Sequence, residues 1–175
     1  MRTRIQWFLL LLFLLAVVSG CNKVDARVSS LRQQLMLAEE PAGAASIADT
    51  RDRFQAEQQP EHDVVVMGRI NAGDFEPWAD GQASFLLAEA LPASDHAATP
   101  GHDPATCPFC RRRAEKAGNA TARVQFRDAK GEILPIDARE LLGVKKDQVV
   151  VVRGKGHVDK LGVLVVSATG IHVRR

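Results

Sequence analysis

The sequence predicts a mainly β protein: a five-stranded barrel with one short helix, an N-terminal helical tether and an insertion rich in Cys and His. Three observations lead to this prediction. Five stretches of β-branched and apolar residues, bounded by Gly, Pro, Asn and Asp, follow residue 61. One short, clearly delimited helix precedes the last two stretches. A long segment without periodicity, residues 91–118, separates the second stretch from the third.

The strands are predicted from alternation and from β-branched content. In the third strand Ala122, Val124 and Phe126 alternate with polar residues, which indicates one buried and one wet face. Gly68 is expected to mark a bulge or bend within the first strand. The five strands are expected at residues 62–70, 82–89, 121–127, 148–153 and 161–173. A hairpin return of the third strand is expected at residues 132–136, and a turn at residues 154–160 joins the last two strands.

The short helix has recognisable ends. Asp137 can cap its start, and Glu140, three residues later, can complete a capping box. Leu141 and Leu142 supply an apolar face, and Gly143 suits a left-handed C-terminal position. We therefore expect one buried helical turn before the fourth strand.

This order of elements resembles the five-stranded oligonucleotide/oligosaccharide-binding (OB) barrel, which places its helix before the last two strands. The Val-rich segments at residues 64–68, 149–154 and 165–171 resemble bacterial periplasmic OB domains, including the haem chaperone of cytochrome c maturation. The resemblance covers residues 62–175 without the insertion. That family's haem-attaching role is not transferred to His172, which lies inside the final predicted strand. A β sandwich or half-barrel is the alternative fold.

The N-terminus is typical of an export signal. A basic start is followed by an almost unbroken apolar run over residues 5–18. This run is shorter than the roughly 20 residues that a membrane-spanning helix needs. The following Val-Ser-Gly-Cys, ending at Cys21, resembles the bacterial lipobox. The resemblance implies that residues 1–20 are a signal peptide and that Cys21 is diacylated, with palmitate as one expected acyl chain. An ordinary signal peptide or an uncleaved anchor is the alternative.

A lipid on Cys21 would attach the protein to a membrane of the bacterial cell envelope, facing the periplasm. Asn22, in place of the Asp that resembles an inner-membrane retention signal, favours the outer membrane. The membrane is therefore the first expected partner.

Residues 21–61 are expected to form the lipid anchor and a helical tether. Val24, Val28, Leu31 and Leu35 fall on one face of a helix. A Pro-Ala-Gly-rich break follows, and a second, weaker helical stretch runs over residues 47–58. Residues 41–61 are thus predicted to be a partly helical linker that sets the barrel off the membrane.

Charge argues against nucleic acid as a partner. The chain has 23 Lys and Arg against 21 Asp and Glu. Removal of Arg2 and Arg4 with the signal leaves 21 of each, so the mature chain lacks the broad positive field of nonspecific nucleic-acid binding.

The insertion carries the candidate metal ligands. Cys107 and Cys110 have the two-residue gap that lets two sulfurs reach one tetrahedral ion, and His102 and His96 can supply nitrogen ligands. His62 is a substitute for His96. Zinc is the expected ion, and copper is its rival because it binds such ligands more tightly.

Three interpretations of the cysteine pair remain open. A metal staple would fix a long loop that otherwise lacks structure. Redox chemistry is the second, because Cys-Pro-Phe-Cys before three arginines resembles the glutaredoxin active site. The strand expected before that motif is absent, which weakens the resemblance. An inert disulfide is the third.

Function follows from these expectations only in outline. The sequence lacks a nucleophile elbow, a phosphate-binding Gly loop and an acidic pair flanked by aromatics, which lowers the expectation of an enzyme. We expect a membrane-anchored, noncatalytic binding or assembly lipoprotein with a metal-stapled Cys/His loop and a protein or small-molecule ligand. The alternative is a thiol–disulfide redox or metal-delivery factor that uses Cys107 and Cys110.

Overall fold

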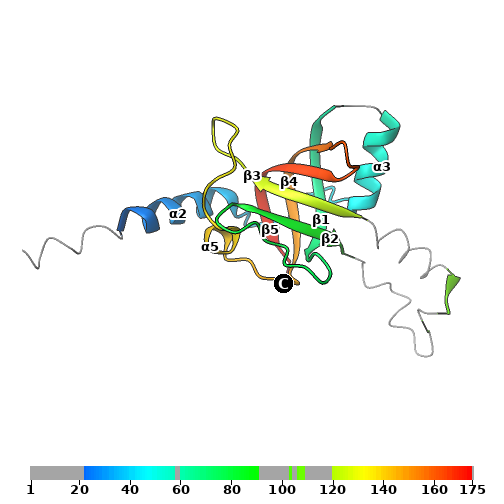
Figure 1. Cartoon of the computed structure of the whole chain (residues 1–175), viewed down its shortest axis with the longest axis horizontal. Coiled ribbons are helices and arrows are strands. Elements are labelled where there is room, and N and C mark those ends of the chain that lie inside the picture. The colour runs from blue at the N-terminus through cyan, green and yellow to red at the C-terminus, as the bar shows by residue number, and fades with distance from the viewer. Residues whose placement is uncertain (1–21, 58–59, 91–102, 104–105, 109–119, 175) are drawn as a thin grey trace, which may run out of the picture.

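Five strands close into a barrel in the computed structural model, which describes residues 22–57, 60–90, 103, 106–108 and 120–174 (Figure 1). The order around the barrel is β1–β2–β3–β5–β4, and every pairing is antiparallel except β3 with β5. With α5 between β3 and β4, this confirms the predicted mainly β, OB-like barrel. The strands are β1 (His62–Ile70), β2 (Ser84–Glu89), β3 (Thr121–Phe126), β4 (Val149–Val158) and β5 (Leu164–Val173).

The barrel is filled from inward-facing strand positions. Aliphatic side chains dominate, as the low aromatic content requires, and two phenylalanines, Phe85 and Phe126, lie with ring centroids 6.4 Å apart. Alternation places the inward residues of each strand in one cluster. The largest fully buried strand side chains in this cluster are Phe85, Phe126, Ile70, Leu87, Leu164, Ile171, Val66, Val124 and Val150.

The predicted turn at residues 154–160 is wrong, because β4 continues to Val158. Gly154 and Gly156 are buried strand positions where a larger side chain would collide with neighbours. The chain turns later, where the Gly162 N–H donates to the Asp159 carbonyl at 3.0 Å. Gly68 likewise lies in regular pairing, and the register shift falls at Arg153/Gly154 instead.

The short helix forms at the predicted place, with the predicted Asp137 cap and C-terminal glycine, but among the described residues no Glu140 side-chain bond completes the capping box. α5 (Ala138–Leu142) begins after Asp137, whose Oδ1 accepts from the Arg139 N–H at 2.9 Å, and it ends at Gly143 with φ of 70°. Leu141 and Leu142 are buried. The capping carboxylate and the left-handed glycine therefore delimit this single turn.

Asp137 should make stability pH-dependent in acid. Its hydrogen bonds to the Arg139 side chain lower the pKa of the carboxyl from 3.8 to about 2. A lowered pKa stabilises the fold above about pH 4, and this stabilisation is lost as the pH falls toward 2. In urea unfolding, Asp137→Asn should cost about 1 kcal/mol at pH 7 and flatten the dependence between pH 4 and pH 2.

The matched control for this change is Asp80→Asn. Asp80 also contacts Arg139, at 2.8 Å, but its side chain is 90% exposed, so little change is expected. Equal pH dependence in the wild type and Asp137→Asn would contradict the assignment.

The N-terminal helix packs through its predicted apolar face. α2 (Asn22–Leu35) buries Val28, and Leu31 and Leu35 lie against the core. The Arg32 Nε donates to the Leu141 carbonyl at 2.8 Å, which joins α2 to α5. None of the described helices is long and apolar enough to cross a bilayer.

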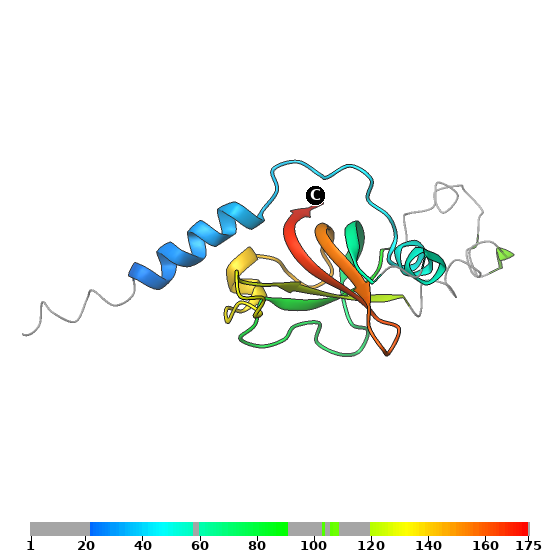
Figure 2. The same ribbon diagram turned by 90° about the horizontal axis from the view of Figure 1, so that it is seen from above.

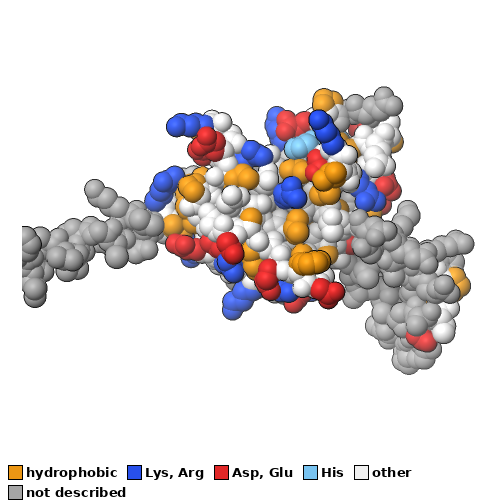
Figure 3. All heavy atoms as spheres, in the orientation of Figure 1, with side chains coloured by type: hydrophobic (Ala, Val, Ile, Leu, Met, Phe, Trp, Pro, Cys, Tyr) orange, Lys and Arg blue, Asp and Glu red, His pale blue; other side chains and the backbone are white. Residues whose placement is uncertain are grey.

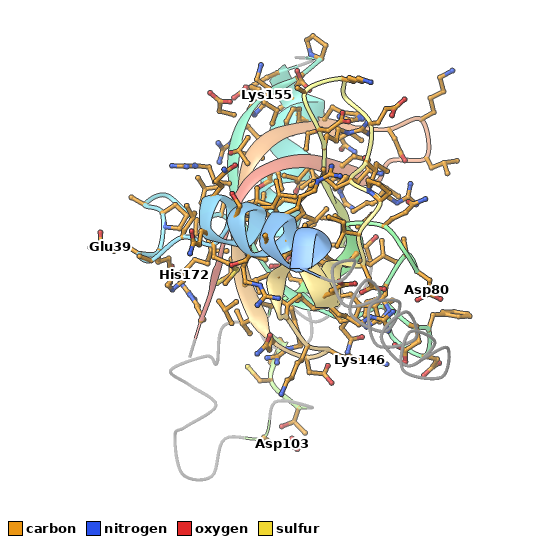
Figure 4. All side chains as sticks on the ribbon, turned by 90° about the vertical axis from the view of Figure 1, so that its left-hand side faces the viewer. Glu39, Asp80, Asp103, Lys146, Lys155 and His172 are labelled. Carbon is orange, nitrogen blue, oxygen red and sulfur yellow. The ribbon has the colours of Figure 1, made fainter. Side chains whose placement is uncertain are left out.

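Residues 36–46 form a strap across the barrel. Figure 2 shows this segment arcing over the ends of β5, β4 and β1. Leu37 donates its N–H to the Ile171 carbonyl at 2.8 Å, and Ala45 donates to Val65 at 2.9 Å. The strap thereby pairs with strand edges that the barrel's own pairings leave open. His172 of β5, labelled in Figure 4, contacts the strap through its Nδ1, which lies 3.1 Å from the Leu37 carbonyl oxygen.

The second helix is where it was predicted, but it does not behave as a free linker. α3 (Ile47–Glu57) packs against β1, β2, β3 and β4, with Ile47 fully buried and Phe54 4% exposed. Ser46 Oγ and Glu89 Oε2 each accept an N–H of its first turn at 3.0 Å. Burial of these apolar side chains makes the described part of residues 41–61 a component of the folded unit.

Candidate functional site

Most of the predicted metal ligands lie outside the described residues. This holds for His96, His102 and Cys110, and also for the lipidation candidate Cys21. Cys107 is described and half-buried, in a turn where the N–H groups of residues 106 and 107 both donate to the Asp103 carbonyl at 3.2 Å. Figure 4 shows Asp103 at the end of the molecule opposite Lys155.

No metal centre is assembled from the described part of the chain: no three His, Cys, Asp or Glu residues there are grouped to hold an ion. His62, the substitute ligand, stacks on Phe54 with ring centroids 3.9 Å apart. Its Nδ1 is buried and has no hydrogen-bond partner among the described atoms. In this position His62 packs α3 onto β1.

A hollow of about 660 Å³ lies where β1, β4 and β5 meet the strap and α3. We call it the basic cleft. Its walls combine basic side chains, small hydroxyls and apolar groups. It is lined by Gly43, Ala45, Thr50, Arg53, Asp63, Val64, Val65, Arg127, Arg153, Gly154, Lys155, Ser167, Ala168 and Thr169.

Strand register brings the polar residues of the cleft into adjacent rows. Asp63 of β1 pairs with Lys155 of β4, and Lys155 pairs with Ser167 of β5. In the next row of that face, Val65 lies opposite Arg153. Since residues at directly paired positions project from the same face, these side chains line one surface of the sheet.

A β-bulge shapes the cleft. Arg153 pairs with Gly170 while Gly154 pairs with Ala168, so Thr169 is the extra residue. Thr169 is exposed, and its Oγ1 donates to the Arg153 carbonyl at 3.2 Å. A Cβ on Gly154 would lie 2.2 Å from the Ser167 carbonyl oxygen, so only glycine fits beside this bulge. Bulges commonly redirect side chains next to functional sites.

Charge in the cleft is unbalanced. Four basic side chains and one carboxylate line it, a formal excess of three positive charges. Lys155 lies 3.9 Å from Glu61, and within the described residues no ion pair joins Arg53 or Arg153 to a carboxylate. The face drawn in Figure 3 instead intersperses basic and acidic side chains.

Sequence reasoning missed this site. Its basic residues come from α3, β4 and the segment after β3, so no motif unites them. One local signal was available: Arg153 and Lys155 alternate with Gly154 and Gly156, which is the two-residue period of a strand. The two glycines, considered locally, instead favour a turn.

A second hollow, about 360 Å³, lies under the segment between β1 and β2. Trp78 meets Phe85 edge-on there, with centroids 5.9 Å apart, and the Arg139 guanidinium lies 5.6 Å from the Trp78 ring centroid. Arg139 also bonds Asp137 and Asp80. OB barrels often bind ligands on this β2–β3 face. The lining of this hollow carries one basic side chain, Arg123, and one carboxylate, Glu76, so it lacks the excess positive charge of the basic cleft.

Comparison of the chain with models of known protein families and with curated proteins gives no match in either case.

Proposed function

We propose that this protein is a noncatalytic binding lipoprotein of the bacterial cell envelope, anchored through lipid on Cys21 and favouring the outer membrane. The barrel supplies the binding surface, and the ligand is a small molecule or a protein. The basic cleft is the observation that carries the binding role, because it concentrates unneutralised charge in a chain that is otherwise balanced.

The arrangement of the helices supports the anchored orientation. α2 begins at Asn22, directly after the proposed lipid site, and extends from one side of the barrel, while α3 covers the other side (Figures 1 and 2). An anchor before α2 leaves α3 and the adjoining cleft on the side away from it.

Lipid labelling tests the anchor. Cells fed radiolabelled palmitate should label the wild-type protein, and Cys21→Ser should abolish the label because the acceptor sulfur is lost. Cys107→Ser is the matched control and should keep the label. Undiminished labelling of Cys21→Ser refutes lipidation at this residue.

We also propose a metal staple in the insertion, with His96, His102, Cys107 and Cys110 as ligands of zinc, or of copper. The support is the ligand spacing in the sequence. Protein purified without chelators should carry about one equivalent of metal by elemental analysis. Cys107→Ser with Cys110→Ser should lose it, whereas His157→Gln, outside the insertion, should not.

The alternative function is thiol–disulfide exchange or metal delivery through Cys107 and Cys110. The partial exposure of Cys107 favours it, since a redox thiol must be reachable. Rapid alkylation of both thiols in metal-free protein supports this alternative, whereas slow alkylation that accelerates on chelation supports the staple.

A further inference from the structure

We propose that the basic cleft binds a phosphate-bearing ligand with at least two negative charges. This inference rests on the proposed function of the protein as a binding module and names the ligand class of its site.

The first argument is the availability of the positive charge. Arg53 and Arg153 have no ion pair among the described residues, and Lys155 has only a long contact with Glu61. Arg127 donates to neutral acceptors, the Gly131 carbonyl at 2.6 Å and Gln125 Oε1 at 2.5 Å. Four cations therefore face one hollow with little internal compensation.

The second argument is the chemistry of the donors. Guanidinium groups carry no acceptor and present planar pairs of N–H groups, which match the oxygens of phosphate. Arg153 and Lys155 come from alternate positions of β4, so both project from the same face. Half-buried Ser167, paired with Lys155, adds a hydroxyl donor to this row.

The third argument is the shape of the site. The bulge at Thr169 and the glycine at position 154 fix the backbone beneath Arg153. A hollow of about 660 Å³ exceeds what one phosphate fills, and Ala45 and Val65 give it apolar wall. The cleft therefore suits an organic phosphate or a diphosphate better than a single inorganic ion.

Two sources share this chemistry: a soluble phosphate compound and a lipid headgroup. A headgroup phosphodiester has one negative charge, less than the cleft's excess of three. α2, which begins directly after the proposed lipid site, also extends from the side of the barrel away from α3 (Figure 2). Both observations favour the soluble compound.

Isothermal titration calorimetry on the full chain in nonionic detergent tests the proposal. Pyrophosphate is the soluble probe, and glycerophosphoglycerol represents the headgroup. The variant Arg153→Gln with Lys155→Gln removes two exposed cations and should weaken pyrophosphate binding at least about tenfold, because charge-assisted contacts are lost. Arg123→Gln, an exposed cation of β3 outside the basic cleft, is the matched control and should bind like the wild type.

A soluble ligand is supported if pyrophosphate binds more tightly than the diester, and if pyrophosphate binding is lost in the double variant but kept in Arg123→Gln. Binding of the diester as tight as that of pyrophosphate, with the same dependence on Arg153 and Lys155, overturns the requirement for two negative charges and assigns the site to headgroups. Absence of binding of both probes at millimolar concentration, or equal binding by the double variant, overturns the proposal. Palmitate labelling would be unaffected, so failure here is distinguishable from failure of the anchored function.

Discussion

Replacing Gly154 with alanine is expected to lower the free energy of unfolding by more than about 3 kcal/mol, at the upper end of overpacking effects. A Cβ at this position would lie 2.2 Å from the Ser167 carbonyl oxygen and 2.8 Å from the Ala168 Cα. Both are backbone atoms, so a rotamer change cannot relieve the contact. The β4–β5 pairing must shift, and with it the bulge that carries Thr169.

Two other glycines of the barrel give a graded comparison for this substitution. A Cβ on Gly68 would lie 2.9 Å from the Leu87 Cβ, and one on Gly156 would lie 3.1 Å from the tips of Val64. Because side-chain tips move more easily than backbone, the loss in urea unfolding should decrease from Gly154→Ala to Gly68→Ala to Gly156→Ala. Equal losses would show that the bulge tolerates a methyl group.

Local patterns predicted most of the barrel because each strand carries its own signal. The alternation of Ala122, Val124 and Phe126 and the capping of α5 by Asp137 depend only on neighbouring residues. The end of β4 does not. Its glycines resemble a turn locally, yet they are required by the atoms of β5 and α3 that lie against them. Only the assembled barrel supplies that information.

The position of the N-terminal helices was also partly predictable. Spacing identified the buried face of α2, but it did not reveal that α3 joins the core. Ile47 and Phe54 are isolated apolar residues in a polar helix, a weak signal by themselves. Ile47 packs against Gly68 and Phe54 packs against Gly156, in space that a side chain at either glycine would occupy. Both glycines lie outside the helix in the sequence, so local patterns do not reveal these contacts.

The candidate site shows the same limit in a stronger form. Sequence spacing directs attention to Cys107 and its neighbours, since metal ligands cluster along the chain. The basic cleft has no such cluster: Arg53, Arg127 and Arg153 meet only because barrel closure brings β4 and β5 beside α3. Binding surfaces built across strands rarely leave a contiguous motif.

Replacing Phe54 with alanine is expected to lower the free energy of unfolding by about 3 kcal/mol, the usual range for a buried phenylalanine. Phe54 is 4% exposed, stacks on His62 and lies against Gly156. Loss of the ring leaves a cavity that the glycine cannot fill. The matched control is Phe75→Ala, which removes a phenylalanine that is 78% exposed and should change stability little.

The same variant decides whether α3 belongs to the cooperative unit. Trp7 lies in the proposed signal peptide, so Trp78 is the sole tryptophan of the mature chain, and it packs on Phe85 of the barrel. Because Ile47 and Phe54 share one core cluster with the strands, Phe54→Ala should move the Trp78 fluorescence transition and the helical circular dichroism transition together. If circular dichroism alone shifts, α3 unfolds independently and acts as the linker that its sequence predicts. A joint shift means that α3 is held on the barrel, where its residues Thr50 and Arg53 line the basic cleft.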